Sequence, residues 1–207
     1  MQEPANAATA PPPAPGAERH PALDFANSTL SLPGNRSLDL LGDPASATRW
    51  LADHALAPAD TGLQQVCVGR LQEFRAQLRT LLGARLTGLP APSEALSAVN
   101  DALTSVPSAP LLHWDEAQGL HRARPHPTDQ IVDHVLALLA ADAADLLTGP
   151  DAERLASCGA APCTRYLVRT HGARHWCSVR CGDRARAARA YAKRTGARAA
   201  PASEPRP

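Results

Sequence analysis

Four cysteines near the C-terminus have the spacing of metal ligands. Cys158 and Cys163 are separated by four residues and Cys177 and Cys181 by three, with thirteen residues between the two pairs. Each short pair presents two thiolates from one tight turn, and the loop between them lets the pairs face one another around a tetrahedral Zn²⁺. Two disulfides or four unrelated thiols are the alternatives. Because nothing in the sequence indicates secretion, we predict one structural zinc ion.

A zinc ion held by four cysteines has no open position for a catalytic water, which favours a structural role. His171 and His175 lie between the pairs and offer alternative ligands, but four cysteines already complete the tetrahedron. The sequence lacks the glycine-rich phosphate loops, nucleophile elbows and HExxH helices of common enzyme classes. We therefore predict that the protein is not an enzyme.

A basic, Ala-rich segment follows the last cysteine and has strong helix propensity. On a helix, cations spaced at i, i+3 and i+7 share one face, and the residues with this spacing are Arg186, Arg189 and Lys193. We expect the opposite side to pack on the zinc core through its apolar residues, which are Ala187, Ala188 and Tyr191. The zinc module therefore leads into a helix with a cationic outer face.

The residues around the second pair are Trp176-Cys177-Ser178 and Cys181-Gly182-Asp183-Arg184. With the basic segment they resemble the CGNR-type zinc finger, which pairs a Cys-x4-Cys knuckle with a Cys-x3-Cys-Gly-Asn-Arg knuckle. The family's Asn is Asp183 here. Either residue can cap a helix start, but an Asp at a nucleic-acid contact would repel the phosphate.

The usual partner of this zinc finger is an N-terminal domain called ABATE, described as a stress-induced transcriptional regulator. Residues 23–28, Leu-Asp-Phe-Ala-Asn-Ser, are similar to the Leu-Asp-Phe-x-Asn-Thr opening of that domain. The resemblance covers residues 20–195 and is most specific in the zinc half. It implies transcriptional regulation.

The net charge of +1 conceals a strong asymmetry. Residues 1–153 hold 9 Arg and 18 Asp or Glu, a net charge of −9, whereas residues 154–198 hold 11 Lys or Arg and one acid, a net charge of +10. A basic module beside an acidic domain predicts that the basic module binds a polyanion. The alternative is that the two halves neutralise one another, within one chain or between two.

We predict that the polyanion is DNA and that phosphate contacts dominate its affinity. The N–H groups at the start of the basic helix suit a phosphate. The predicted contacts are Arg174, Arg180, Arg184, Arg186, Arg189 and Lys193. The alternative is a zinc-stabilised module that binds a protein or RNA partner without sequence-specific DNA readout.

The N-terminal half has the pattern of a helical domain. Asp43 and Pro44 mark a helix start, with Asp at the N-cap and Pro at the first position. Apolar residues at helical spacing predict helices over residues 44–56, 60–86, 93–103 and 128–147. Cys67 lies on one apolar stripe and is predicted to be a buried thiol without a metal.

Two short apolar segments between the third and fourth predicted helices indicate a β-hairpin. Residues 111–114 and 120–123 flank a loop that contains Gly119. His113 and His121 would meet across the strands. We interpret them as strand histidines, because no acid or cysteine surrounds them at ligand spacing.

Asp24 and Asn27 are polar residues set among apolar ones, in a short strand or a first helical turn. They fit a cap with a hydrogen bond to backbone, or a ligand pocket for a small-molecule effector, which the similarity to the ABATE opening supports. An enzyme with its site at these two residues is the remaining functional alternative.

No apolar run is long enough to span a bilayer, and the N-terminus lacks the features of a secretory signal. We expect a cytoplasmic protein with no membrane partner and with reduced thiols.

The predicted fold is mainly α with a small β-hairpin (α+β), in which a helical N-terminal domain precedes a four-Cys zinc module that ends in a basic helix. The predicted parts are a disordered Pro/Ala-rich tail over 1–19, an ABATE-like helical domain over 20–150, a CGNR-type zinc finger over 154–195 and a disordered tail over 196–207. The predicted function is DNA-binding transcriptional regulation. The N-terminal domain would sense a signal or mediate assembly, for example as a homodimer.

Overall fold

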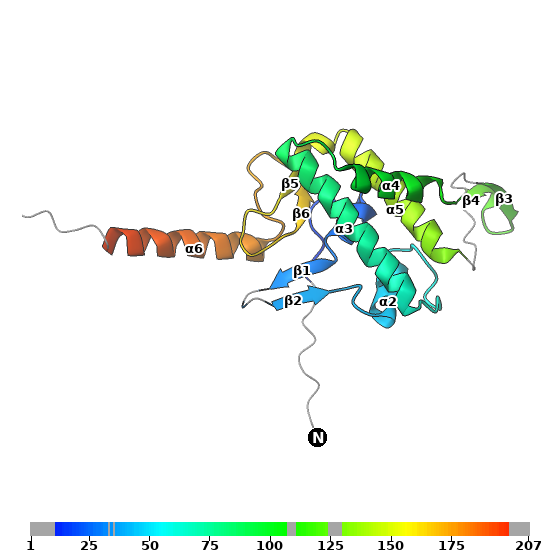
Figure 1. Ribbon diagram of the computed structural model, residues 1–207, viewed down its shortest axis with the longest axis horizontal. Helices are drawn as coiled ribbons and strands as arrows, with labels where there is room; N and C mark the ends of the chain where they lie inside the picture. The colour runs from blue at the N-terminus through cyan, green and yellow to red at the C-terminus, as the bar shows by residue number, and fades with distance from the viewer. Residues whose placement is uncertain (1–10, 33, 35, 107–110, 124–129, 199–207) are drawn as a thin grey trace, which may run out of the picture.

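The computed structural model describes residues 11–32, 34, 36–106, 111–123 and 130–198. Its helices are α1 Pro21–Ala26, α2 Pro44–Asp53, α3 Gln65–Thr87, α4 Ser93–Thr104, α5 Ile131–Thr148 and α6 Val179–Arg198, with a 3-10 turn, η1, at Ala152–Arg154. Its strands are β1 Thr29–Leu32, β2 Arg36–Asp39, β3 Leu111–Asp115, β4 Gly119–Ala123, β5 Leu155–Ser157 and β6 Tyr166–Val168. Within the described residues these strands form three two-stranded antiparallel sheets, β1–β2, β3–β4 and β5–β6 (Figure 1).

The long helix α3 is the centre of the N-terminal domain. Its apolar residues recur at helical spacing, and the buried stripe consists of Val68, Leu71, Phe74, Leu78, Leu81 and Leu82. Helices α1, α2, α4 and α5 pack against α3 and complete one hydrophobic core. The helix ends at Gly88, whose φ of 67° is left-handed and unstrained for glycine.

The helices predicted from the sequence are confirmed, although two begin later than expected. Asp43 caps α2, because its carboxylate accepts a hydrogen bond of 3.0 Å from the N–H of Ser46. Helix α3 begins at Gln65 and α5 at Ile131. None of the helices in the described part of the chain combines the length and hydropathy needed to cross a bilayer.

One arginine of α3, Arg75, is buried. The side chain of Arg75 donates hydrogen bonds of 2.6 Å to both carboxylate oxygens of Asp39, at the end of β2, and one of 2.8 Å to the hydroxyl of Ser28. A buried charge persists only when it is paired and hydrogen-bonded. This pair therefore holds the β1–β2 hairpin against α3.

The hairpin predicted over residues 111–123 is confirmed, with His113 opposite His121. Two further hairpins were not predicted, β1–β2 and β5–β6. Their strands have only four or three residues, too few for a period of two to be recognised. The fold class, mainly α with small antiparallel hairpins, is confirmed.

Residues 11–19, which we call the N-terminal strap, lie against the C-terminal module. The sequence pattern had placed them in a disordered tail. The carbonyl of Pro15 accepts a hydrogen bond of 2.8 Å from the N–H of Val168, and the carbonyl of Pro12 accepts one of 2.9 Å from the guanidinium of Arg165. These bonds explain the difference, because a partner elsewhere in the chain orders the strap. Residues 1–10 lie outside the described part.

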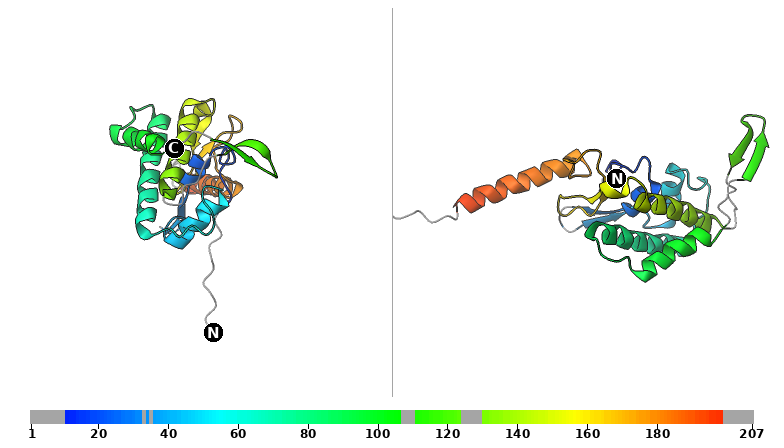
Figure 2. Two further views of the ribbon diagram at one scale, coloured as in Figure 1. Left: turned by 90° about the vertical axis from the view of Figure 1, so that its right-hand side faces the viewer. Right: turned by 90° about the horizontal axis from the view of Figure 1, so that it is seen from above.

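The C-terminal module has a second, small core, made of Ala14, Ala156, Cys158, Ala160, Leu167, Cys177 and Cys181. Only the N-terminal part of α6, up to Ala185, touches this core. Beyond it the helix projects from the body of the molecule (Figures 1 and 2). Ala187 and Ala188 are exposed, and the side chain of Tyr191 is 64% exposed. The prediction that these residues pack on the zinc core is wrong, because α6 extends away from it. Residues 199–207, most of the predicted C-terminal tail, lie outside the described part.

Candidate metal centre

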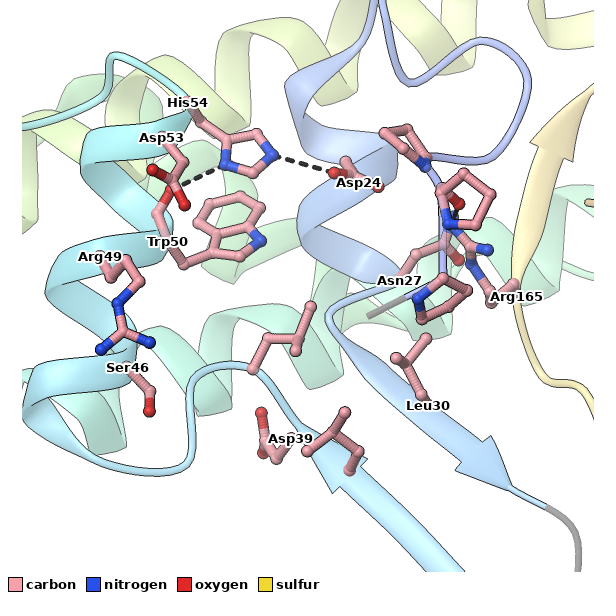
Figure 3. A pocket seen from close by; sticks show the side chains of 15 residues that line it. Asp24, Asn27, Leu30, Asp39, Ser46, Arg49, Trp50, Asp53, His54 and Arg165 are labelled. Atoms are coloured by element: carbon pink, nitrogen blue, oxygen red, sulfur yellow. Dashed lines mark hydrogen bonds and ion pairs between the residues drawn. The ribbon is translucent and has the colours of Figure 1, made fainter. Parts of the chain in front are cut away.

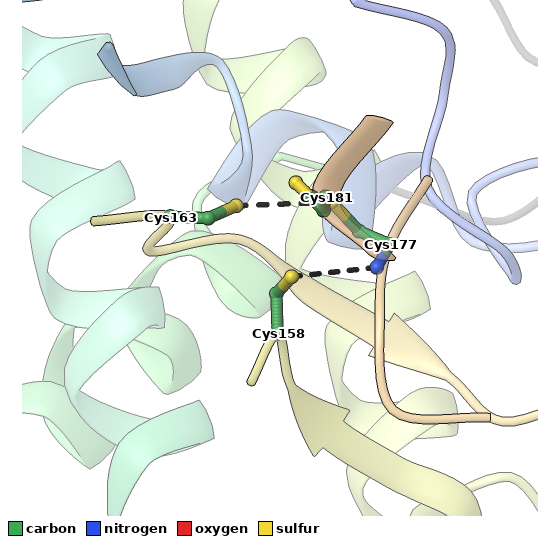
Figure 4. A group of neighbouring side chains, drawn as sticks. All are labelled: Cys158, Cys163, Cys177 and Cys181. Atoms are coloured by element: carbon green, nitrogen blue, oxygen red, sulfur yellow. Dashed lines mark hydrogen bonds between the residues drawn. The ribbon is translucent and has the colours of Figure 1, made fainter. Parts of the chain in front are cut away.

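The sulfur atoms of the two cysteine pairs converge at one point. Cys158, Cys163, Cys177 and Cys181 each offer a sulfur, and all four sulfurs lie within 4.8 Å of one another (Figure 4). Three of these residues are buried and Cys163 is half-buried. Cys67 is half-buried on α3 and belongs to no such group in the described residues. The arrangement therefore has the ligand number and the enclosure of a structural Zn²⁺ site.

The crowded sulfurs shift one another's acidity. Hydrogen bonds from Cys163 and Cys177 lower the pKa of Cys158. Donating to Cys158 raises the pKa of Cys163 to about 11. Hydrogen bonds with Cys158 and Cys163, together with burial, raise the pKa of Cys177. One thiolate is therefore favoured in this space, whereas four need a cation to offset their repulsion. A divalent metal supplies that charge.

Local structure places each sulfur. Cys158 follows β5, and its N–H donates to the carbonyl of Arg165, 2.8 Å away. The N–H of Cys163 closes a turn onto the carbonyl of Ala160 at 2.8 Å. Ser178 caps α6, because its hydroxyl accepts a hydrogen bond of 3.2 Å from the N–H of Cys181. The second pair therefore sits where α6 begins.

Two arginines compensate the charge of the centre. The buried guanidinium of Arg165 lies 3.9 Å from the sulfur of Cys177, and that of Arg184 lies 3.4 Å from the sulfur of Cys181. Zn²⁺ with four thiolates carries two negative charges. Two N–H···S contacts from cations therefore neutralise the site without occupying a ligand position.

Arg184 also donates to the carbonyls of Ala160 and Ala161, at 3.1 and 3.0 Å. It therefore joins the second turn of α6 to the first knuckle. We had predicted that this side chain faces outward toward a phosphate. The structure instead turns it toward the metal centre.

Asp183 does not cap the basic helix. Because α6 begins at Val179, Asp183 lies in its second turn, and it accepts a hydrogen bond of 2.6 Å from Arg186. This exposed pair holds the guanidinium of Arg186 near the start of the helix.

A cationic face runs along α6 and begins at a tryptophan. The guanidinium carbons of Arg186 and Arg189 lie 5.4 and 5.5 Å from the ring centroid of Trp176. Gly182 permits this packing, since a Cβ there would lie 3.1 Å from Cε3 of Trp176. Lys193 is exposed one turn further along the same face.

A hollow of about 240 Å³ lies between the loop and the start of α6. Arg174 from the loop and Arg186 from the helix both line it, together with Ser178, Val179 and other residues. The structure thus brings together two of the predicted DNA contacts. Arg180 is exposed on the first turn of α6.

A larger cavity of about 680 Å³ lies in the N-terminal half and contains both predicted pocket residues (Figure 3). Asp24 pairs with His54 at 2.9 Å, and the imidazole of His54 stacks on Trp50 with ring centroids 3.8 Å apart. Arg165 of the zinc module and Pro11–Pro13 of the strap complete the wall. The cavity is therefore bounded by both halves of the chain.

The acidity of His54 reflects these neighbours. Burial alone would lower its pKa. Hydrogen bonds to Asp24 and to the carbonyl of Trp50, with the charges of Asp24 and Asp53, outweigh burial and raise the pKa above its usual value of 6.5.

Asn27 joins the two halves rather than pointing freely into the cavity. Its side chain donates to the carbonyl of Tyr166 at 2.9 Å and accepts from the N–H of Tyr166 at 2.7 Å. This amide pairs with β6 as a neighbouring strand would. The backbone partner that we had considered for Asn27 thus belongs to the zinc module.

Sequence reasoning missed three residues of these sites. Arg165 was counted only as a charge, and His54 and Trp50 only as parts of a helix. Their spacing of four residues puts His54 and Trp50 on one helical face, which could have signalled the stacked pair. No local pattern marks Arg165, because its partners are far away in the sequence.

Comparison with family models identifies both halves of the chain. The model for ABATE, described as a putative stress-induced transcription regulator, matches residues 19–150. The model for the CGNR zinc finger matches residues 154–194. A comparison with curated proteins finds no match. Together with the sulfur cluster, the second match shows that the chain carries one structural Zn²⁺.

Proposed function

Because the chain belongs to the ABATE family and carries a CGNR zinc finger, we propose that it is a DNA-binding transcription regulator whose contact helix is α6. The observation that carries this proposal is the exposed cationic face of α6, anchored at its first turn by the zinc ligands. A zinc ion without an open coordination position gives the module no catalytic role. Its effect is to fix where α6 starts and in which direction it points.

The stacked arginines favour a nucleic-acid contact. Arg186 and Arg189 are held against Trp176, so less side-chain entropy is lost when they bind a phosphate. The projection of α6 leaves this face free of the acidic N-terminal domain (Figure 1). The exposed cations Arg186, Arg189 and Lys193 therefore act on a partner outside the molecule.

The hollow between Arg174 and Arg186 provides a place for one backbone phosphate. It lies at the N-terminus of α6, where N–H groups and the helix dipole attract anions. Arg180 lies on the same turn and reaches the next phosphate. Lys193 extends the contact toward the far end of the helix.

We assign signal sensing to the cavity beside Trp50 and His54. A small molecule bound there would touch the strap and Arg165, whose guanidinium also contacts Cys177. Occupancy would thereby affect the charge balance of the zinc centre and the position of α6. A thermal-shift screen tests this assignment. A true effector would stabilise the parent but not Trp50→Ala, and a compound that stabilises both equally would count against the cavity.

The direct test of DNA binding is fluorescence anisotropy with a labelled duplex and the zinc-loaded full chain. Arg186→Ala and Arg189→Ala should each weaken binding by severalfold. The matched control is Arg70→Ala, an equal change of charge on α3. Zinc content is measured for each variant, so that loss of the metal is not mistaken for loss of a contact.

The outcome also separates DNA from other partners. We expect duplex DNA to bind more tightly than double-stranded RNA of the same sequence. Equal affinities for the parent and both α6 variants would show that α6 is not the contact. Preference for RNA would favour the alternative of an RNA-binding zinc module.

A further inference from the structure

The β3–β4 hairpin exposes large apolar side chains to solvent. Leu112, Trp114 and Leu120 are 68%, 69% and 68% exposed. The hairpin stands apart from the helices at the end of the molecule opposite α6 (Figures 1 and 2). Proteins seldom leave a contiguous apolar patch uncovered unless it binds something.

The register of the strands places these side chains on one face. Trp114 lies opposite Leu120, and Leu112 lies opposite Arg122. Directly paired residues point to the same side of an antiparallel sheet, as do alternate residues along one strand. One face therefore consists of Leu112, Trp114, Leu120 and Arg122. The other face carries Leu111, His113, His121 and Ala123.

The turn fixes this register. The carboxylate of Asp115 accepts hydrogen bonds from the N–H groups of Ala117 and Gln118, at 2.9 and 2.7 Å. Gly119 supplies the left-handed φ of 66° that the turn requires. The shape of the tip is thus well specified, whereas an isolated two-stranded sheet has little stability of its own in water. A second layer packed on the apolar face would stabilise the hairpin.

We propose that the apolar face of β3–β4 is a homodimer interface, in which two copies of the hairpin pack face to face and antiparallel. A twofold interface must be complementary to itself. The hairpin meets that requirement, because Glu116 lies at its tip and Arg122 near its base, with the apolar residues between. Antiparallel packing brings Glu116 of one copy to Arg122 of the other at both ends.

The two charged residues are available for this contact. Both side chains are exposed, and within the described residues neither has an ion-pair partner in its own chain. Trp114 is the type of residue that dominates the energetics of such interfaces. The interface leaves α6 uncovered at the far end of each copy, so assembly and DNA binding are separable.

Sedimentation velocity over a range of concentrations tests the proposal on the full, zinc-loaded chain. The parent should show a monomer–dimer equilibrium. Leu112→Lys should raise the dissociation constant by about tenfold or more. The matched control is Leu111→Lys, the same change on the adjacent residue, which is exposed on the other face and should dimerise as the parent does.

A charge exchange tests the antiparallel arrangement. Glu116→Arg and Arg122→Glu should each weaken the dimer, because like charges then meet at both ends. The double variant with both changes should recover the affinity of the parent. Zinc content and far-UV circular dichroism should not change in any of these variants. A parent that stays monomeric at every concentration, or equal effects of Leu111→Lys and Leu112→Lys, would overturn the proposal.

Discussion

The metal centre depends on residues other than its four ligands. Arg165 and Arg184 place cations against two of the sulfurs, and Ser178 sets the start of the helix that carries Cys181. The four cysteines were predictable because metal ligands recur at short, fixed spacings. Arg165 was not, because its contacts join residues far apart in the chain.

Replacing one ligand should remove the metal. Cys177→Ser leaves three thiolates around the ion, and we expect less than one zinc per chain by elemental analysis. Cys67→Ser is the matched control, since that thiol lies on α3 away from the cluster. Full zinc occupancy in Cys177→Ser would contradict the assignment of the site.

The pair of Asp24 and His54 should make stability depend on pH. Since the folded pKa of His54 is raised above 6.5, its protonated form stabilises the fold below that pH. This stabilisation is lost as the pH rises through the folded pKa. The free energy of unfolding, measured in urea, should therefore decline between pH 6 and pH 8, and it should decline less in His54→Gln. His171→Gln, which changes an exposed histidine, should retain the decline. An identical decline in the parent and in His54→Gln would show that His54 does not cause the pH dependence of stability.

Among the elements, β6 connects the zinc module to the N-terminal domain. It pairs with β5 on one side and with the side chain of Asn27 on the other. The long helices were predictable from their apolar stripes. The short strands were not, since three or four residues carry too little pattern, and their pairing depends on contacts between the two halves.

Removing the Asn27 amide should loosen the junction between the halves. Asn27→Ala leaves the N–H and the carbonyl of Tyr166 without their partner, which we expect to destabilise the fold by about 1–3 kcal/mol. Asn100→Ala, an equal truncation at an exposed position on α4, should cost less. Equal midpoints of urea unfolding for these two variants would show that the amide contributes nothing.

The whole molecule consists of an acidic helical body with a basic helix projecting from one end and an apolar hairpin at the other. Charge counting predicted that the two halves differ in sign. It did not predict their arrangement, and α6 was expected to pack back on the zinc core. The helix projects instead, because its apolar contacts with the small core end at Ala185.

Chelation of the zinc should affect one part of the chain selectively. The small core around the sulfurs includes Ala14 of the strap, so hydrogen exchange should accelerate in residues 11–19 and 155–198. The amides of α3 and α5, in the larger core, should stay protected because their packing does not involve the metal. Uniform acceleration over the whole chain would show that the two cores are not separable.

The central claim, that α6 binds DNA phosphates, is tested most directly by the salt dependence of affinity. We predict that Arg186→Ala, Arg189→Ala and Lys193→Ala, combined in one zinc-loaded variant, reduce the slope of log affinity against log salt by about 3. The matched control combines Arg49→Ala, Arg70→Ala and Arg85→Ala, an equal loss of charge from the N-terminal domain, and should keep the slope of the parent. If the α6 variant has the same slope as the parent, α6 does not contact DNA.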